Sequence, residues 1–158
     1  MPKILISYYS KSGNTKKMAQ GILQGIEVIK DIHGKILSTS ETTIDDLFDS
    51  DAIIIGSPTY FGTMAAPVKK LIDESVKYFG KLEGKIGGAF TSSAQIGGGN
   101  ETTLLSLIQA FMIHGMIIQG MGIGNHYGPV SIKEPDKQVI NECINYGRLI
   151  ANLVKKIC

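Results

Sequence analysis

Residues 10–15, with the sequence Ser-Lys-Ser-Gly-Asn-Thr, are of the types that bind phosphate. They stand between an apolar run at 4–9, typical of a buried strand, and apolar residues at helical spacing from residue 13 onward. Backbone N–H groups and the positive end of the helix dipole converge at such a turn. Each hydrogen bond to an ionised group contributes about 1.5–3 kcal/mol, so several together can hold a dianion. The turn therefore predicts a phosphate site formed by Ser10, Lys11, Ser12, Gly13, Asn14 and Thr15. The alternative is that Ser12 or Asn14 only caps the helix.

Two further polar loops follow predicted strands. Residues 56–62, after the β-branched run at 52–55, place two aromatic side chains beside a glycine. An aromatic face suits a flat heteroaromatic ring, and glycine lets the backbone approach the ring edge. Residues 91–99, after a strand predicted at 86–90, supply hydroxyl groups and bare backbone. The alternatives are that Phe61 packs inward and that the loop at 91–99 is a flexible connector. We expect ring contacts from Pro58, Thr59, Tyr60, Phe61 and Gly62, and from Ser92, Ser93, Ala94, Gln95, Ile96, Gly97 and Gly98.

Apolar strands and amphipathic helices alternate along the whole chain. Besides the strands above, the patterns predict strands at 35–39 and 116–118 and helices at 13–31, 44–48, 67–79, 104–114 and 136–156. Five βα units predict an α/β fold with a five-stranded parallel sheet and helices on both faces. In such sheets ligands bind beyond the carboxyl ends of the strands, where the strand order reverses. All three polar loops follow a strand, so we expect them to share one edge.

These loops also exclude several classes of nucleotide-binding protein. The dinucleotide pattern G-x-G-x-x-G is absent after the first predicted strand, where only Gly13 stands, and the chain has no Walker-type G-x-x-x-x-G-K-[ST]. A phospho-receiver domain needs acidic residues where this chain has the Tyr8-Tyr9 and Gly56-Ser57 pairs. A monophosphate joined to a planar ring satisfies all three loops. We therefore predict flavin mononucleotide (FMN) as the cofactor.

Size and composition limit the remaining possibilities. The chain has 158 residues, 43% of them hydrophobic, which predicts one domain over residues 1–158. The net charge is +2, and the basic residues are too dispersed for a nucleic-acid surface. No apolar stretch approaches the ~20 residues of a membrane span, and the first strand begins too early for a signal peptide, so we expect a cytoplasmic protein. Cys143 and Cys158 are not spaced as metal ligands, and we expect no metal.

At these same residues the chain resembles a known family. The segments 8–15, 56–62 and 90–105, together with His114-Gly115-Met116 and Tyr127-Gly128-Pro129, are similar to those of the flavodoxin-like NAD(P)H:quinone oxidoreductases of the Trp-repressor-binding-protein type. The resemblance implies a flavodoxin-like three-layer sandwich with strand order 2-1-3-4-5, and FMN bound by the loops above. It also implies a homo-oligomer, either a dimer or a tetramer. His114 matches a histidine near the flavin and is the predicted catalytic residue; the alternative is a favourable interaction with its helix dipole.

The predicted function is that of an FMN-dependent oxidoreductase. It would take electrons from NAD(P)H or a redox protein and pass them to a quinone or similar acceptor. The first alternative is a flavodoxin-type one-electron carrier. Such carriers surround the flavin with acidic groups, whereas residues 56–62 and 91–100 contain no Asp or Glu. The second alternative is a flavin-free regulatory or scaffold protein, against which the three intact loops argue.

Overall fold

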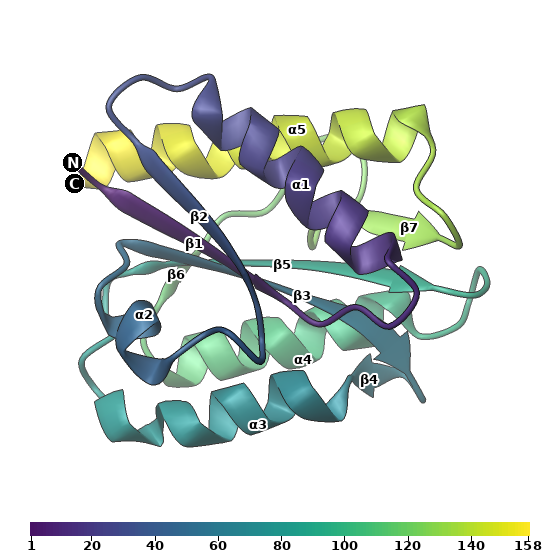
Figure 1. Ribbon diagram of the computed structural model, residues 1–158, viewed down its shortest axis with the longest axis horizontal. Helices are drawn as coiled ribbons and strands as arrows, with labels where there is room; N and C mark the ends of the chain where they lie inside the picture. The colour runs from purple at the N-terminus through teal and green to yellow at the C-terminus, as the bar shows by residue number, and fades with distance from the viewer.

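The computed structural model describes residues 1–158 and is built around one twisted, mainly parallel β-sheet (Figure 1). Five strands lie in the order β2-β1-β3-β5-β6, with parallel pairing between neighbours. This is the 2-1-3-4-5 order that the resemblance implies, and the fold is flavodoxin-like, as predicted. The strands are β1 (Lys3–Tyr8), β2 (His33–Ser38), β3 (Ala52–Tyr60), β5 (Ile86–Ser93) and β6 (Ile117–Ile118).

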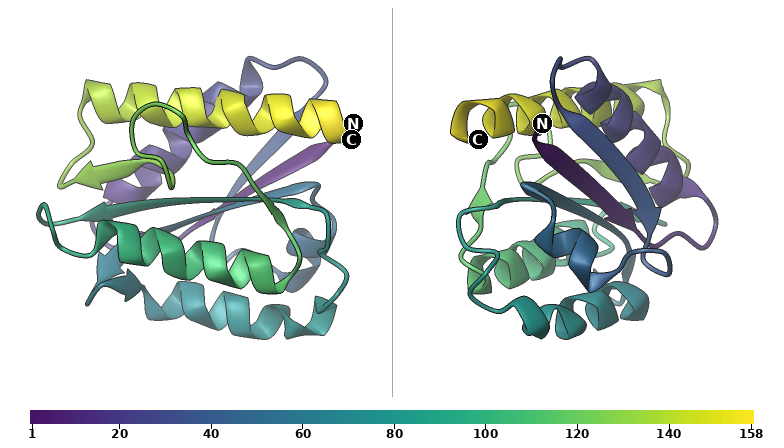
Figure 2. Two further views of the ribbon diagram at one scale, coloured as in Figure 1. Left: turned by 180° about the vertical axis from the view of Figure 1, so that it is seen from behind. Right: turned by 60° about the vertical axis from the view of Figure 1, so that its left-hand side comes forward.

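Helices cover both faces of the sheet (Figures 1 and 2). One face carries α1 (Asn14–Glu27) and α5 (Lys137–Ile157); the other carries α2 (Ile44–Phe48), α3 (Ala66–Glu74), a 3₁₀ turn η1 (Ser75–Tyr78) and α4 (Asn100–Ile113). Side chains alternate between the faces of a strand. Ile4 and Ile6 of β1 therefore enter the core beneath α1 and α5, and Leu5 enters the core beneath α3 and α4. None of these helices has both the length and the hydropathy that crossing a bilayer requires.

Helices α1 and α5 cross closely because glycines line their contact. A Cβ atom on Gly25 would lie 2.0 Å from the carbonyl oxygen of Ile144, and one on Gly147 would lie 2.1 Å from that of Ile22. These distances are far inside van der Waals contact, so any larger residue would push the helices apart. The contact holds α1, and with it the turn that precedes α1, against the sheet.

Two short strands share the fifth position of the sheet. β6 pairs with the start of β5, and β7 (Val130–Ile132) pairs with its end. Residues 119–129 leave the sheet between them and pass beside α5, where the side chain of Asn125 donates to Glu142 at 2.8 Å (Figure 2, left). Within this gap the N–H of Ala89 donates to the hydroxyl of Tyr146 from α5 at 3.1 Å. A side chain thus accepts from a buried amide that has no neighbouring strand there.

Strands β3 and β5 are longer than the sequence pattern predicts. The predicted loop at 56–62 is largely strand, because β3 continues to Tyr60, turns, and returns antiparallel as β4 (Thr63–Met64). The turn residues Phe61 and Gly62 have φ values of 50° and 77°, as a tight turn between twisted strands requires. Likewise β5 continues through Ser93, so only residues 94–99 form the third loop. Both strand ends contain Ser and Thr residues, which are typical of turns, so the sequence pattern predicts loops where the strands continue.

Candidate functional site

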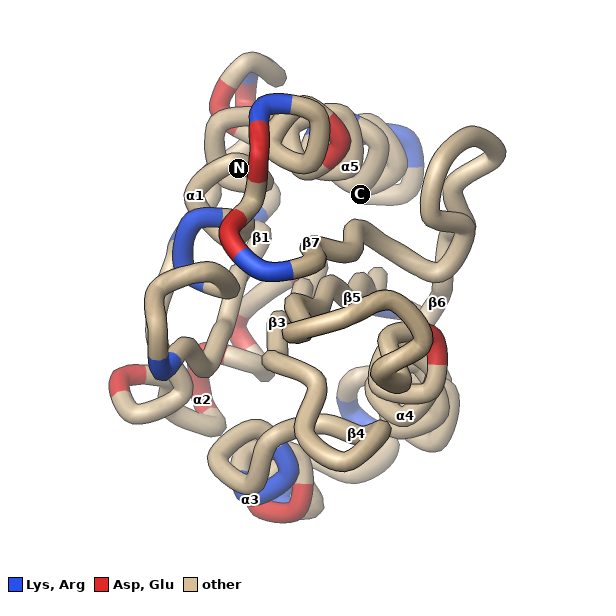
Figure 3. The backbone as a smooth tube through the Cα atoms, turned by 90° about the vertical axis from the view of Figure 1, so that its right-hand side faces the viewer, with Lys and Arg blue, Asp and Glu red and all other residues tan.

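Three predicted segments meet at the carboxyl edge of the sheet, which faces the viewer in Figure 3. The turn at 10–13 follows β1, the β3–β4 hairpin ends β3, and residues 94–99 follow β5. Because β1, β3 and β5 are adjacent and parallel, their carboxyl ends lie side by side. This edge therefore carries every loop residue predicted for the cofactor: Ser10, Lys11, Ser12, Gly13, Asn14, Thr15, Pro58, Thr59, Tyr60, Phe61, Gly62, Ser92, Ser93, Ala94, Gln95, Ile96, Gly97 and Gly98.

The turn after β1 has the geometry of an anion site. Gly13 has a φ of 97° and is the N-cap residue of α1, whose N-terminus receives no side-chain cap. Ser10 braces the turn, because its Oγ accepts the N–H of Gly13 at 3.0 Å. The first N–H groups of α1 therefore remain available to a ligand, supported by the helix dipole. The alternative in which Ser12 or Asn14 caps α1 is wrong.

Thr15 and Ser92 connect this turn to β5 through a buried hydrogen bond. Their hydroxyl oxygens lie 2.9 Å apart, and the two residues are 1% and 6% exposed. One hydroxyl donates to the other, and each keeps capacity for two further hydrogen bonds. These two predicted ligands therefore hold α1 to β5 in addition to any contact with a cofactor.

A second group of hydroxyls holds the ends of β3 and β5 together. Thr91 donates to the carbonyl oxygen of Ser57 at 2.7 Å, and its Oγ1 lies 2.8 Å from that of Thr59. The Oγ of Ser57 accepts the N–H of Ala65 at 2.8 Å. The hydroxyl of Thr59, predicted to contact the ring, is thus already bonded within the protein. Ser57 and Thr91 lie within the predicted loops but are absent from the predicted ligands; the signal for Ser57 is that it stands two residues from Thr59, on the same face of a strand.

The tip of the β3–β4 hairpin rests on the start of α4. Thr102 donates to the carbonyl oxygen of Gly62 at 2.6 Å. A Cβ atom on Gly99, which has a φ of 98°, would lie 2.5 Å from the Cα of Gly62. The backbones of the two glycines therefore touch, and the second and third predicted loops form one continuous wall.

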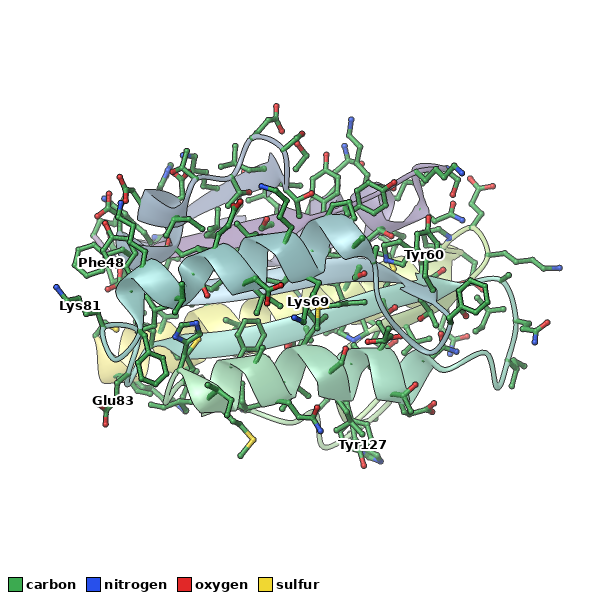
Figure 4. All side chains as sticks on the ribbon, turned by 90° about the horizontal axis from the view of Figure 1, so that it is seen from below. Phe48, Tyr60, Lys69, Lys81, Glu83 and Tyr127 are labelled. Carbon is green, nitrogen blue, oxygen red and sulfur yellow. The ribbon has the colours of Figure 1, made fainter.

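Apolar side chains are exposed at this edge. Phe61 is fully exposed at the hairpin tip, where the alternative of inward packing is wrong, and Ile96 is 87% exposed. Tyr60 is 39% exposed and lies where β3 ends (Figure 4); its ring meets that of Tyr9 edge-on, with 6.5 Å between centroids. Partial burial and the neighbouring Tyr9 raise the pKa of Tyr60, which keeps its hydroxyl neutral. We call Tyr60, Phe61 and Ile96 the apolar platform; exposed apolar groups of this kind indicate a surface that a ligand covers.

His114 lies at the opposite edge of the sheet, so the structure does not bring it together with the loops predicted for the flavin. It follows α4, whose 14 residues extend about 20 Å from the cofactor edge. Its Nε2 lies 2.7 Å from the Oγ of Ser75, and its Nδ1 is buried without a partner. Burial lowers the pKa of His114 and so favours the neutral ring. The N–H of Gly84 donates to the carbonyl oxygen of Gly115, the residue after His114, and Glu83, the residue before Gly84, appears in Figure 4 at the end of the molecule remote from Tyr60.

Known proteins are similar to this chain in sequence and in architecture. The family model described as NADPH-dependent FMN reductase matches residues 4–125. The chain is 34% identical to a flavodoxin of Clostridium saccharobutylicum, over 98% of this chain and 99% of that protein. It is 31% identical to an NAD(P)H dehydrogenase (quinone) of Archaeoglobus fulgidus, over 100% of both. The crystal structure of a flavodoxin, WrbA-like protein from Agrobacterium tumefaciens matches with a TM-score of 0.85 and 27% identity, covering 100% of both chains.

The fold and the carboxyl-edge site define a flavodoxin-like flavoprotein that acts as an oxidoreductase. Its cofactor is FMN, and the residues present fit that group. The uncapped start of α1 at Gly13 suits the phosphate, and the apolar platform suits the ring. The chain belongs to the NADPH-dependent FMN reductase family.

Proposed function

We propose that this protein transfers electrons from NADPH, through FMN, to a quinone or similar small acceptor. The family description supports NADPH as the donor, and the Archaeoglobus relative is named for quinone reduction. In this proposal the N–H groups at the start of α1 hold the phosphate of FMN, Tyr60 and Phe61 of the apolar platform flank one face of the ring, and residues 94–98 lie along its polar edge. The polar side chains around the phosphate are those of Ser10, Lys11, Ser12, Asn14 and Thr15.

The protein contributes binding and orientation to this reaction. Bound FMN supplies the reversible transfer of a hydride or of single electrons. The N–H groups beside Gly13 and the dipole of α1 offset the charge of the phosphate. Tyr60 and Phe61 exclude water from one side of the ring and leave the other side open to the donor and acceptor in turn. Residues 56–62 and 91–100 contain no carboxylate, so they do not repel negative charge on the reduced ring.

One observation carries the proposal: the uncapped, glycine-initiated helix α1 shares an edge with the apolar platform. Gly13→Ala tests it, and Gly80→Ala is the matched control. Both glycines have positive φ, 97° and 77°, and an added Cβ would meet no atom within 4 Å at either position. Each substitution therefore costs about 1–2 kcal/mol of backbone strain, but only Gly13 lies at the proposed phosphate site.

The readout is calorimetric titration of FMN into the apoprotein. We expect Gly13→Ala to weaken FMN binding and Gly80→Ala to leave it unchanged. Equal affinity in the two variants would count against the phosphate site. The reaction itself is tested by steady-state turnover of benzoquinone with NADPH and with NADH.

A one-electron carrier is the second candidate function. It is favoured by the flavodoxin of Clostridium saccharobutylicum, which matches 98% of this chain at 34% identity. The two candidates differ in turnover: an enzyme oxidises NADPH with benzoquinone as acceptor, whereas a carrier binds FMN and exchanges electrons only with redox proteins. FMN binding without turnover by either dinucleotide would therefore favour the carrier.

We further propose a homo-oligomer located in the cytoplasm, with one domain over residues 1–158. Leu105, Met112 and Ile113 are exposed on α4, and exposed apolar side chains on one helix support association between copies. Light scattering on the purified protein tests the oligomer, and a monomeric mass would contradict it. Cell fractionation tests the location, and a single cooperative unfolding transition tests the domain organisation.

A further inference from the structure

A polar groove lies beside the turn at 10–13, which we call the phosphate turn, on the side toward β2. It encloses about 830 Å³ between the start of α1, the segment 38–42 after β2, and α3. Tyr8 and Tyr9 line it together with three lysines, Lys11, Lys16 and Lys70. Its volume is within the range of small-molecule sites, roughly 300–1,000 Å³. The proposed FMN site shares only the turn at 10–13 with this groove.

The charges lining the groove favour an anionic ligand. Lys11 and Lys16 form no ion pair. Lys70 pairs with Glu74 on the next turn of α3, and Glu74 is the one carboxylate that lines the groove. Three ammonium groups and one carboxylate therefore line the groove; a second carboxylate, Glu41, lies beyond the lining, where hydrogen bonds from Ser38 and the charge of Lys16 lower its pKa. Hydroxyl groups from the segment 38–42 complete a lining that suits a phosphorylated sugar.

Tyr9 connects the groove to the apolar platform. It lines the groove, and its ring also meets the ring of Tyr60 edge-on. The buried pair Thr15 and Ser92 lies on the other side of the phosphate turn, toward β5. A ligand that stacks at the platform with one end can therefore extend past Tyr9 and place its other end in the groove.

We propose that this groove binds the adenosine 2′-phosphate end of NADPH and selects NADPH over NADH. This inference rests on the proposed function, because it takes the donor to be a nicotinamide dinucleotide. The two dinucleotides differ only by a phosphate on the adenosine ribose, so selection requires cations where that phosphate lies. Lys16 and Lys70 supply these cations, and the rings of Tyr8 and Tyr9 offer surfaces for the purine.

Lys16→Gln and Lys70→Gln in the FMN-loaded protein test the proposal, with Lys17→Gln and Lys69→Gln as matched controls. Each control residue is the neighbouring lysine on the same helix; it pairs with a carboxylate elsewhere and does not line the groove. The first measurement is KM for NADPH and for NADH with benzoquinone as acceptor. The second, independent of turnover, is calorimetric titration with adenosine 2′,5′-bisphosphate and with AMP.

We expect each groove variant to raise the KM for NADPH by about tenfold, as for one lost charge-assisted hydrogen bond. The KM for NADH and the affinity for FMN should stay unchanged, and adenosine bisphosphate should bind more weakly to both variants. Equal ratios of the two KM values in groove and control variants would overturn the groove assignment and leave the proposed activity intact. Absence of turnover with both dinucleotides would overturn the proposed activity; unchanged bisphosphate affinity in both groove variants would still overturn the groove.

Discussion

Replacing Thr15 with Val and Ser92 with Ala tests the connection between the phosphate turn and β5. Both hydroxyl groups are buried, and their oxygens lie 2.9 Å apart. Either single substitution leaves the other hydroxyl buried without its partner, which costs about 1–3 kcal/mol of unfolding free energy. The double substitution removes both hydroxyl groups and leaves neither unpaired. Its cost should therefore fall below the sum of the single costs by about 1 kcal/mol or more.

Urea unfolding of the apoprotein, followed by circular dichroism, gives the four free energies of this cycle. Thr15→Val combined with Lys69→Gln is the control, because Lys69 is exposed and pairs with Asp73 on α3. The control effects should add. Additivity of Thr15→Val and Ser92→Ala within about 0.5 kcal/mol would refute the reasoning, since the two hydroxyls would then act independently.

Three further predictions concern the surrounding structure. Tyr146→Phe should lower the free energy of unfolding by about 1–3 kcal/mol, because the buried N–H of Ala89 loses its acceptor; an unchanged urea midpoint would contradict this. Although partial burial opposes its charge, hydrogen bonds lower the pKa of Asp46 from 3.8 to about 2. The free energy of unfolding of the wild type should therefore exceed that of Asp46→Asn by about 2 kcal/mol at neutral pH. This difference should disappear as the pH falls from about 4 to 2, as measured by urea unfolding at a series of acid pH values. His114→Gln should leave FMN affinity and turnover unchanged, and lost turnover would restore a catalytic role. Because burial lowers the pKa of His114, wild-type stability should decrease below about pH 6.5, and the variant should lack that decrease.

Local patterns in the sequence are sufficient to predict most of the sheet and its helices. The run at 52–55 is rich in β-branched residues and is followed by Gly56, so it predicts a buried strand, and in the structure it is buried at the centre of the sheet. The continuation of β3 to Tyr60 and of β5 to Ser93 is not predictable in this way. Ser57, Thr59 and Thr91 satisfy one another across the two strands, and that pairing is invisible until the strands are adjacent.

His114 shows that a sequence motif alone does not determine whether a residue lies at the site. The residues 114–116 fit the family pattern, yet the length of α4 carries His114 to the far edge of the sheet. Distance along a helix is fixed by its rise per residue, so a motif at the end of a helix cannot reach a ligand at its start. The polar loops do lie at the proposed ligand edge, because each directly follows a strand whose carboxyl end is there.

By itself, the sequence determined which residue types follow which strand, and therefore the phosphate turn, the aromatic pair and the glycine-rich segment. Only the tertiary structure decided which side chains meet: Thr15 with Ser92, 77 residues apart, and Lys16 of α1 with Lys70 of α3 in one groove. The physical reason is that strand and helix formation depends on near neighbours, whereas hydrogen bonding and burial between distant segments depend on how the helices pack on the sheet.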